Sequence, residues 1–152
     1  MTNKGKRILH IAITIAIMVF IFVQSALSAD LSMQESNVIV KWLASFLHVQ
    51  PETLSFIVRK CAHFLEYLVL GISTLVSVRD LSRWSSGKSA ITALLISAAY
   101  AATDELHQMF VQGRSCEVRD ILIDSLGALA GILIACLISF LRSKKKQMAK
   151  QK

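Results

Sequence analysis

The chain has 152 residues, of which 54% are apolar, and its mean hydropathy is +0.55. An ordinary soluble domain carries about 45–50% apolar residues, so this composition excludes that class and indicates a membrane protein. The net charge of +7 does not indicate a nucleic-acid-binding protein, because the basic residues form short clusters beside apolar segments. We therefore expect no nucleic-acid partner and interpret the basic clusters as signals for membrane topology.

Four segments are long and apolar enough to cross a bilayer, whose hydrocarbon core of about 30 Å requires about 20 helical residues. They run over residues 8–27, 54–78, 89–110 and 120–141. The first also resembles a signal peptide, since basic residues precede it and small residues follow it. Its apolar run is longer than that of a signal peptide, so we expect a span that is not cleaved.

The segment between the first two spans, residues 30–53, is long for a loop. It contains apolar residues at mostly helical spacing, namely Val38, Trp42, Leu43, Phe46 and Val49. We expect a short amphipathic helix at the outer membrane interface, which could equally pack against the other spans. Pro51 then marks the turn into the second span.

The orientation follows from the basic residues, because cytoplasmic loops of membrane proteins collect Lys and Arg. Twelve of the 17 basic residues flank the two termini or lie between the second and third spans. We therefore expect an all-α integral membrane protein with four transmembrane helices, a short outer interfacial helix and both termini in the cytoplasm. Residues 1–142 form one membrane domain in this prediction. Residues 143–152 form a basic cytoplasmic tail, which we expect to be disordered and attracted to anionic lipid.

Acidic residues concentrate on the outer side of this arrangement. Of the ten acidic residues, all except Asp80 lie in outer loops or at the outer ends of the second, third and fourth spans. A charged side chain deep in a bilayer costs about 2.5–3.5 kcal/mol on insertion scales. So many ionisable groups therefore require pairing with one another or a water-filled recess. His10 and His48 lie outside this cluster and are expected to be solvated or interfacial.

The second span carries polar residues on one broad helix face: Lys60, His63, Glu66 and Tyr67. We expect Arg59 to point elsewhere, toward lipid headgroups. On the third span Asp104, His107 and Gln108 form a stripe, and Glu105 is rotated off it by about 100°.

The connection that follows is short and polar. Gly113 permits a turn that brings Arg114 back over the helix ends. Asp120 and Asp124 begin the fourth span on the face shared by Gly127 and Gly131. These two glycines form a G-x-x-x-G motif, which allows a neighbouring helix to approach closely, so the acids are expected to face protein. The three cysteines have no metal-like spacing and are expected to be free thiols.

Together these motifs resemble the VanZ-like family of bacterial membrane proteins. The resemblance rests on Lys60-x-x-His63-Phe64-x-Glu66-Tyr67, Asp104-Glu105-x-His107-Gln108-x-Phe110, Gly113-Arg114, and Asp120 leading to Gly127-x-x-x-Gly131. It extends from Phe20 to about Gly131, with Asp124 at a position where Asn is expected to be common in the family. The resemblance implies a multi-pass protein of the bacterial cytoplasmic membrane whose founding member lowers susceptibility to the lipoglycopeptide teicoplanin. It supplies no mechanism.

Three hypotheses remain open for the polar cluster. In the first, an outer recess binds a lipid headgroup, a cell-wall lipid or a lipoglycopeptide-related ligand. Its ligand-binding residues would be Lys60, Glu105, Gln108, Arg114, Asp120 and Asp124. In the second, the protein is an enzyme that acts on a phospholipid or a cell-wall lipid intermediate. Its catalytic residues would be His63, Glu66, Asp104 and His107.

In the third hypothesis the charges only lock the helices together. The cluster also holds enough nitrogen and oxygen donors for a divalent ion. Its spacing does not require one, because His63-x-x-Glu66 is a weak pattern and the chain has no H-E-x-x-H motif. We therefore assign no metal ligand and no cofactor from the sequence. Membrane lipids are the expected partners, and the oligomeric state is not determined by these patterns.

Overall fold

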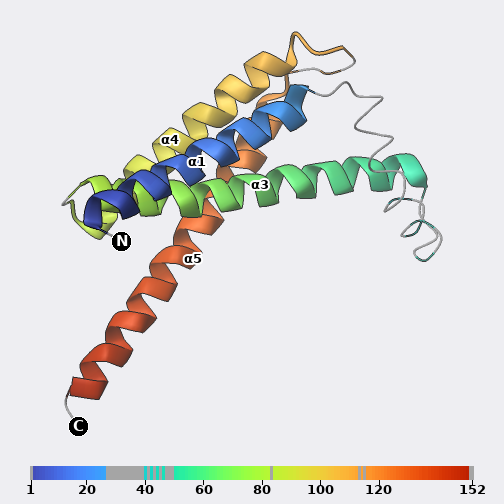
Figure 1. Ribbon diagram of the computed structural model, residues 1–152. Coiled ribbons are helices and arrows are strands. Elements are labelled where there is room, and N and C mark those ends of the chain that lie inside the picture. Colours follow the sequence, from blue (N-terminus) through green and yellow to red (C-terminus); the bar gives the residue numbers. More distant parts are fainter. Residues whose placement is uncertain are drawn as a thin grey trace.

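The computed structural model describes residues 2–26, 40, 42, 44, 46, 50–82, 84–112, 114 and 116–150. Over this part of the chain the regular structure is helical. The long helices are α1 (Asn3–Ala26), α3 (Pro51–Leu81), α4 (Ser86–Gln108) and α5 (Val118–Lys150). Figure 1 shows α1 and α4 lying across α3, while the second half of α5 extends away from the other helices.

Within the described part of the chain, three helices, α1, α3 and α5, are long and apolar enough to cross a membrane. Large apolar side chains point outward from the bundle, as expected of a surface that faces lipid. The prediction of membrane-spanning helices is therefore confirmed for these three. In α4 the last turns carry Asp104, Glu105 and Gln108, and serine and alanine fill much of the rest. Its crossing of the membrane stays a prediction, as does the orientation of the termini.

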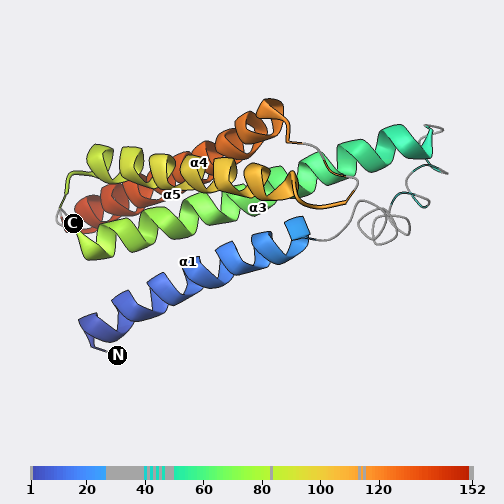
Figure 2. The same cartoon turned by 90° about the horizontal axis from the view of Figure 1, so that it is seen from above.

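The central helix is α3, which contacts α1, α4 and α5. Figure 2 shows it running between α1 on one side and α4 and α5 on the other. A Cβ atom added at Gly127 or Gly131 would collide with the α3 backbone at Phe64 or Leu68. The G-x-x-x-G motif of α5 therefore lies directly against α3, which confirms the predicted close approach.

Two small groups of buried side chains fill the bundle. One joins all four long helices around Ile21, Tyr67 and Leu70. The other lies nearer the opposite end of the bundle, around Leu75 and Ile132. Hydrogen bonds between helices supplement this packing, because the Tyr100 hydroxyl donates to the Met18 carbonyl oxygen at 2.6 Å.

The end of the bundle that holds the N-terminus and the end of α3 carries one ion pair. His10 Nδ1 lies 2.5 Å from Asp80 Oδ2, and the two side chains are 34% and 35% exposed. The partial exposure of His10 is consistent with the predicted solvated or interfacial position, and the ring also has a specific partner on α3 that was not predicted. The sequence did not reveal the pair because the two residues are far apart along the chain.

Most helix ends lie within a few residues of the predicted spans. Helix α3 begins at Pro51, where a proline is favoured because its missing N–H would have no partner. Helix α4 ends at Gln108, two residues before the predicted end at Phe110. The expected disorder of the tail is wrong for residues 143–150, which continue α5 as helix. Lysine, glutamine, methionine and alanine are good helix formers, so a helix can propagate through this basic segment.

The predicted interfacial helix falls largely outside the described residues. Residues 40, 42, 44 and 46 are helical, and the rings of Trp42 and Phe46 stack with centroids 6.5 Å apart. Gly113 and His48 also lie outside the described residues.

Candidate functional site

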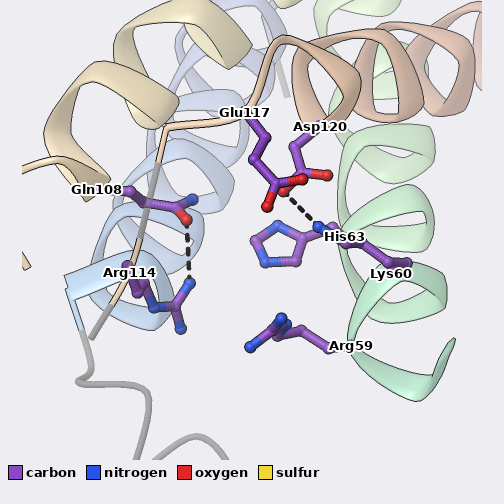
Figure 3. A pocket seen from close by; sticks show the side chains of 7 residues that line it. All are labelled: Arg59, Lys60, His63, Gln108, Arg114, Glu117 and Asp120. Atoms are coloured by element: carbon purple, nitrogen blue, oxygen red, sulfur yellow. Dashed lines mark hydrogen bonds and ion pairs between the residues drawn. The ribbon is translucent and has the colours of Figure 1, made fainter. Parts of the chain in front are cut away.

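A small cavity opens where α4 ends and α5 begins, and we call it the polar recess. It has a volume of about 60 Å³ and lies between α3 and the connection that joins α4 to α5. Its lining is charged or polar throughout: Arg59, Lys60, His63, Gln108, Arg114, Glu117 and Asp120. Figure 3 shows the side chains of Arg59, His63 and Arg114 converging on the same space.

Arg114 reaches the recess from the connection, as predicted. Its guanidinium donates to the Gln108 side-chain oxygen at 3.3 Å and to the Gln24 carbonyl oxygen at 3.5 Å. Burial lowers the pKa of Arg114, and the positive charge of Arg59 lowers it further. An arginine stays protonated in proteins, so two like charges share this recess. The carboxylates of Glu117 and Asp120 line the same cavity, so its three cationic side chains, Arg59, Lys60 and Arg114, outnumber its carboxylates by one.

Lys60 forms an ion pair with Asp120, which joins α3 to the first turn of α5. The two side chains are only 14% and 16% exposed, so the pair is largely shielded from solvent. The structure therefore brings these two residues together at the recess, and their role in ligand binding stays a prediction.

Our expectation for Arg59 was wrong, because its side chain lines the recess instead of pointing away from it. Arg59 and His63 are four residues apart and therefore share a helix face. The ring of Phe56 lies beside three cationic groups at the edge of the recess. The distances from its centroid to Arg59, Lys60 and Arg119 are 5.9, 5.1 and 5.6 Å.

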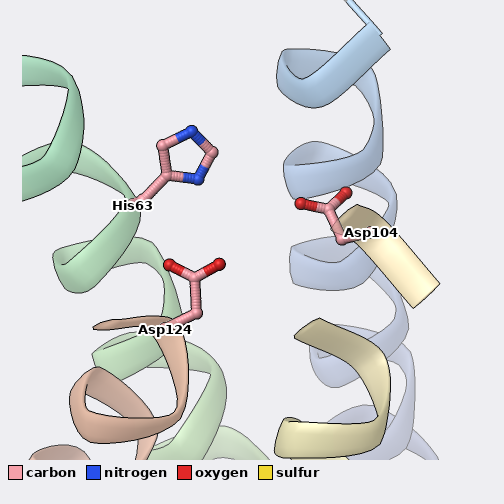
Figure 4. A group of neighbouring side chains, drawn as sticks. All are labelled: His63, Asp104 and Asp124. Carbon is pink, nitrogen blue, oxygen red and sulfur yellow. The ribbon is translucent and has the colours of Figure 1, made fainter. Parts of the chain in front are cut away.

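Two carboxylates lie deeper in the bundle than the recess. Asp104 of α4 is 2% exposed and Asp124 of α5 is 1% exposed. Asp104 Oδ2 accepts hydrogen bonds from the Ser25 hydroxyl at 2.8 Å and from the Gln108 amide at 3.3 Å. The remaining Asp104 oxygen and both Asp124 oxygens have no hydrogen-bond partner. His63 lies beside them, and donor atoms of the three residues are within 4.8 Å of one another (Figure 4).

Glu105 is also buried, although the predicted stripe left it to one side. Its carboxylate accepts the backbone N–H of Glu117 at 2.9 Å. It thereby fixes the connection that carries Arg114, and it does not line the recess. This geometry makes Glu105 a support for the recess; its predicted role in ligand binding is not established by it.

The structure places His107 and Glu66 away from the recess lining. The ring of His107 stacks on Phe22 of α1, with centroids 4.4 Å apart, and its Nε2 is buried without a partner. Glu66 lines an apolar groove between α1 and α3. Of the proposed catalytic residues, His63 and Asp104 therefore lie together, whereas His107 and Glu66 face α1. Their catalytic roles stay predictions.

Beside the recess runs an apolar groove of about 500 Å³ between α3 and α5. Its walls are Phe56, Ile57, Cys61, Phe64, Leu65 and Ile123, with Lys60 and Arg119 as its charged residues. Lys60 therefore borders both the groove and the polar recess. The thiols of Cys61, Cys116 and Cys136 are free, as expected.

Sequence reasoning missed two members of the site in addition to Arg59. Ser25, which bonds Asp104, stands at the end of the first span, and Glu117, which bonds Glu105 through its backbone N–H, stands just before the fourth. Neither was predicted as a site residue. A helical wheel identifies one face of one helix, but it does not show which residues of another helix that face meets. The only signal was that Ser25 and Glu117 stand where apolar helices become polar.

Comparison with known proteins identifies a family for this chain. The family model described as VanZ/LLP1 matches residues 10–139, which is most of the chain and includes every residue of the recess. No curated protein and no solved structure matches the chain.

Proposed function

Because the chain belongs to the VanZ/LLP1 family, we propose that it is a bacterial plasma-membrane protein that binds an anionic lipid headgroup in its polar recess. In this proposal the binding contributes to lipoglycopeptide (teicoplanin) resistance. The observation that carries it is the convergence of Arg59, Lys60 and Arg114 on one small cavity beside an apolar groove. Guanidinium groups match the geometry of phosphate oxygens and bind them with charge-assisted hydrogen bonds.

The size of the recess limits what it can hold. Its volume of about 60 Å³ is far below the range of about 300–1,000 Å³ typical of pockets for drug-sized ligands. A whole lipoglycopeptide therefore does not fit, but a single phosphate group does. This favours a headgroup ligand over the antibiotic itself.

The neighbouring groove supports a lipid over a free anion. Its walls are almost entirely apolar, as suits an acyl chain. Lys60 stands where the groove meets the recess, so one molecule can place a phosphate against the cations and an acyl chain along Phe56 and Phe64. A phospholipid or a phosphate-bearing cell-wall lipid has this combination of groups.

The distribution of basic residues supports an outward-facing recess. The Lys-rich end of α5 lies at the opposite end from the recess, and basic segments favour the cytoplasmic side. The recess would then face the outer leaflet, which a lipoglycopeptide reaches first. By retaining or presenting an anionic lipid there, the protein would change the surface on which the lipid tail of the antibiotic anchors.

The test is teicoplanin susceptibility of a sensitive host that expresses the wild type, Arg114→Gln or Arg142→Gln at equal membrane levels. Arg142 is an exposed residue of α5 far from the recess, so it controls for loss of one arginine. We expect protection from the wild type and from Arg142→Gln, and none from Arg114→Gln. Equal protection from Arg114→Gln would remove the recess from the mechanism. No protection from the wild type would refute the resistance role.

A further inference from the structure

We infer that His63, Asp104 and Asp124 form a binding site for a divalent transition-metal ion inside the bundle. The three residues come from three helices, α3, α4 and α5, and their donor atoms lie within 4.8 Å of one another. Zinc–ligand bonds of about 2.0–2.2 Å place donors on one ion about 3–4 Å apart. A small rotation of these side chains therefore brings the set to coordination distance.

The second observation concerns the oxygens of Asp124. This side chain is 1% exposed, and neither of its carboxylate oxygens has a hydrogen-bond partner. Figure 4 shows the carboxylate pointing toward His63 and toward the side of the bundle from which Asp104 projects. One Asp104 oxygen also lacks a partner. Buried polar atoms in proteins almost always have a partner. A cation bound between these three oxygens would be that partner.

The charge balance at this end of the bundle also favours a bound cation. Glu117, which lines the recess, forms an ion pair with Arg119. Five more carboxylates are gathered in and around the recess: Glu66, Asp104, Glu105, Asp120 and Asp124. The neighbouring cations are Lys60, Arg114 and Arg59, and Lys60 is already paired with Asp120. These five carboxylates therefore outnumber the three cations by two, and one divalent ion would neutralise that difference. Buried charges are tolerated when they are paired or when they coordinate a metal.

The donor set indicates which ions fit. One imidazole and two carboxylates suit zinc or manganese better than calcium, which prefers oxygen donors alone. Three protein ligands also leave a coordination position open, as in catalytic zinc sites. His63 lines the polar recess as well, so that open position would be reached from the recess. The ion site does not require lipid binding, and lipid binding does not require the ion.

The experiment measures metal retention by the purified full-length protein in detergent. The protein is washed with chelator, equilibrated with Zn²⁺ or Mn²⁺ separately and passed through a desalting column, and bound metal is counted by mass spectrometry. We expect about one ion per chain for the wild type. Asp124→Asn and His63→Gln should each retain at least about tenfold less, since changing even a residue that only hydrogen-bonds a metal ligand costs about 10–100-fold in affinity.

His10→Gln and Asp80→Asn are the matched controls, because they remove the same side-chain types from the other end of the bundle. Both should retain the ion. Elution volume and helical circular dichroism identify a variant that has not folded, and two independent ligand substitutions keep the test decisive. No retained ion in the wild type with either metal, or full retention by both ligand variants, would overturn the inference. Arg114→Gln separates the two proposals, because it should lose lipid binding and keep the metal.

Discussion

The two ends of the bundle use charge in different ways. At the end with the N-terminus, His10 and Asp80 form one pair that is about one-third exposed on each side. Close by, the Thr14 hydroxyl bonds the hydroxyls of Ser73 and Ser77 at 2.7 and 2.9 Å. At the recess end, by contrast, carboxylates are buried with oxygens that have no partner, and two arginines share one cavity.

This contrast separates polar groups that join helices from the polar groups to which we assign a ligand in the proposals above. At the first end the ion pair and the hydroxyl bonds of Thr14 join α1 to α3, and the hydroxyl of Thr74 on α3, which has no partner, carries no charge. The recess end has more charge than locking requires, and part of that charge is unmatched in buried positions. Unpaired buried charge destabilises a fold, so its presence favours a site that is completed by bound groups.

The largest effect on stability is expected from Lys60→Ala at the recess end. It leaves Asp120 without its partner in a position that is only 16% exposed. Breaking a buried ion pair by removing one partner costs about 3–5 kcal/mol. Denaturant titration in micelles should show this loss in the free energy of unfolding. The double variant Lys60→Ala, Asp120→Ala should recover part of the loss, and no recovery would mean that the pair does not act as a unit.

Gly131→Ala tests the packing that holds the two ends together. The added methyl group would meet the Leu68 carbonyl group of α3, so the helices must separate. Overpacking of this kind costs about 1–3 kcal/mol. Gly87→Ala is the control, since a Cβ there meets nothing within 4 Å and alanine favours helix. A Gly131→Ala protein as stable as the Gly87→Ala protein would contradict the close contact between α3 and α5.

Ser25→Ala should have a smaller effect at the recess end. It removes the 2.8 Å hydrogen bond to Asp104 and leaves that carboxylate with the Gln108 amide. A buried acceptor that loses one of its donors costs about 1–2 kcal/mol. Thermal unfolding of Ser25→Ala against Ser143→Ala, a serine on the exposed end of α5, measures the difference. Equal midpoints for the two variants would place Ser25 outside the network.

His10→Gln should have the smallest effect, because it breaks a pair that solvent already screens. Exposed ion pairs contribute about 0–1 kcal/mol. The same denaturant titration should therefore show a loss well below that of Lys60→Ala. A loss as large as that of Lys60→Ala would erase the contrast between the two ends.

The helices could be predicted because apolar length and the positions of Pro51 and the glycines are local signals. The G-x-x-x-G face of α5 was correctly expected to face protein, since small residues at that spacing have few other uses in a membrane helix. The end of α5 was not predicted, because a run of lysines is compatible with both disorder and helix. Which of the two forms depends on propagation from the preceding helix.

The site was predicted as a set of residues but not as a geometry. Helical spacing grouped Lys60 with His63 and Asp104 with Gln108, and the structure brings these residues to the same end. It did not show that His107 turns toward Phe22 or that Ser25 meets Asp104. Those contacts depend on the rotation and crossing of whole helices, which the packing of distant apolar residues decides.

The most direct test of the account is the affinity of the purified protein for two short-chain lipids that differ only in headgroup charge. Isothermal titration in non-ionic detergent would compare dioctanoyl phosphatidic acid with dioctanoyl phosphatidylcholine. A charge-assisted hydrogen bond contributes about 1.5–3 kcal/mol, so the anionic lipid should bind at least about tenfold more tightly. Arg114→Gln should abolish this preference and Arg142→Gln should keep it. Equal affinities of the wild type for both lipids would contradict the assignment of the recess as an anionic headgroup site.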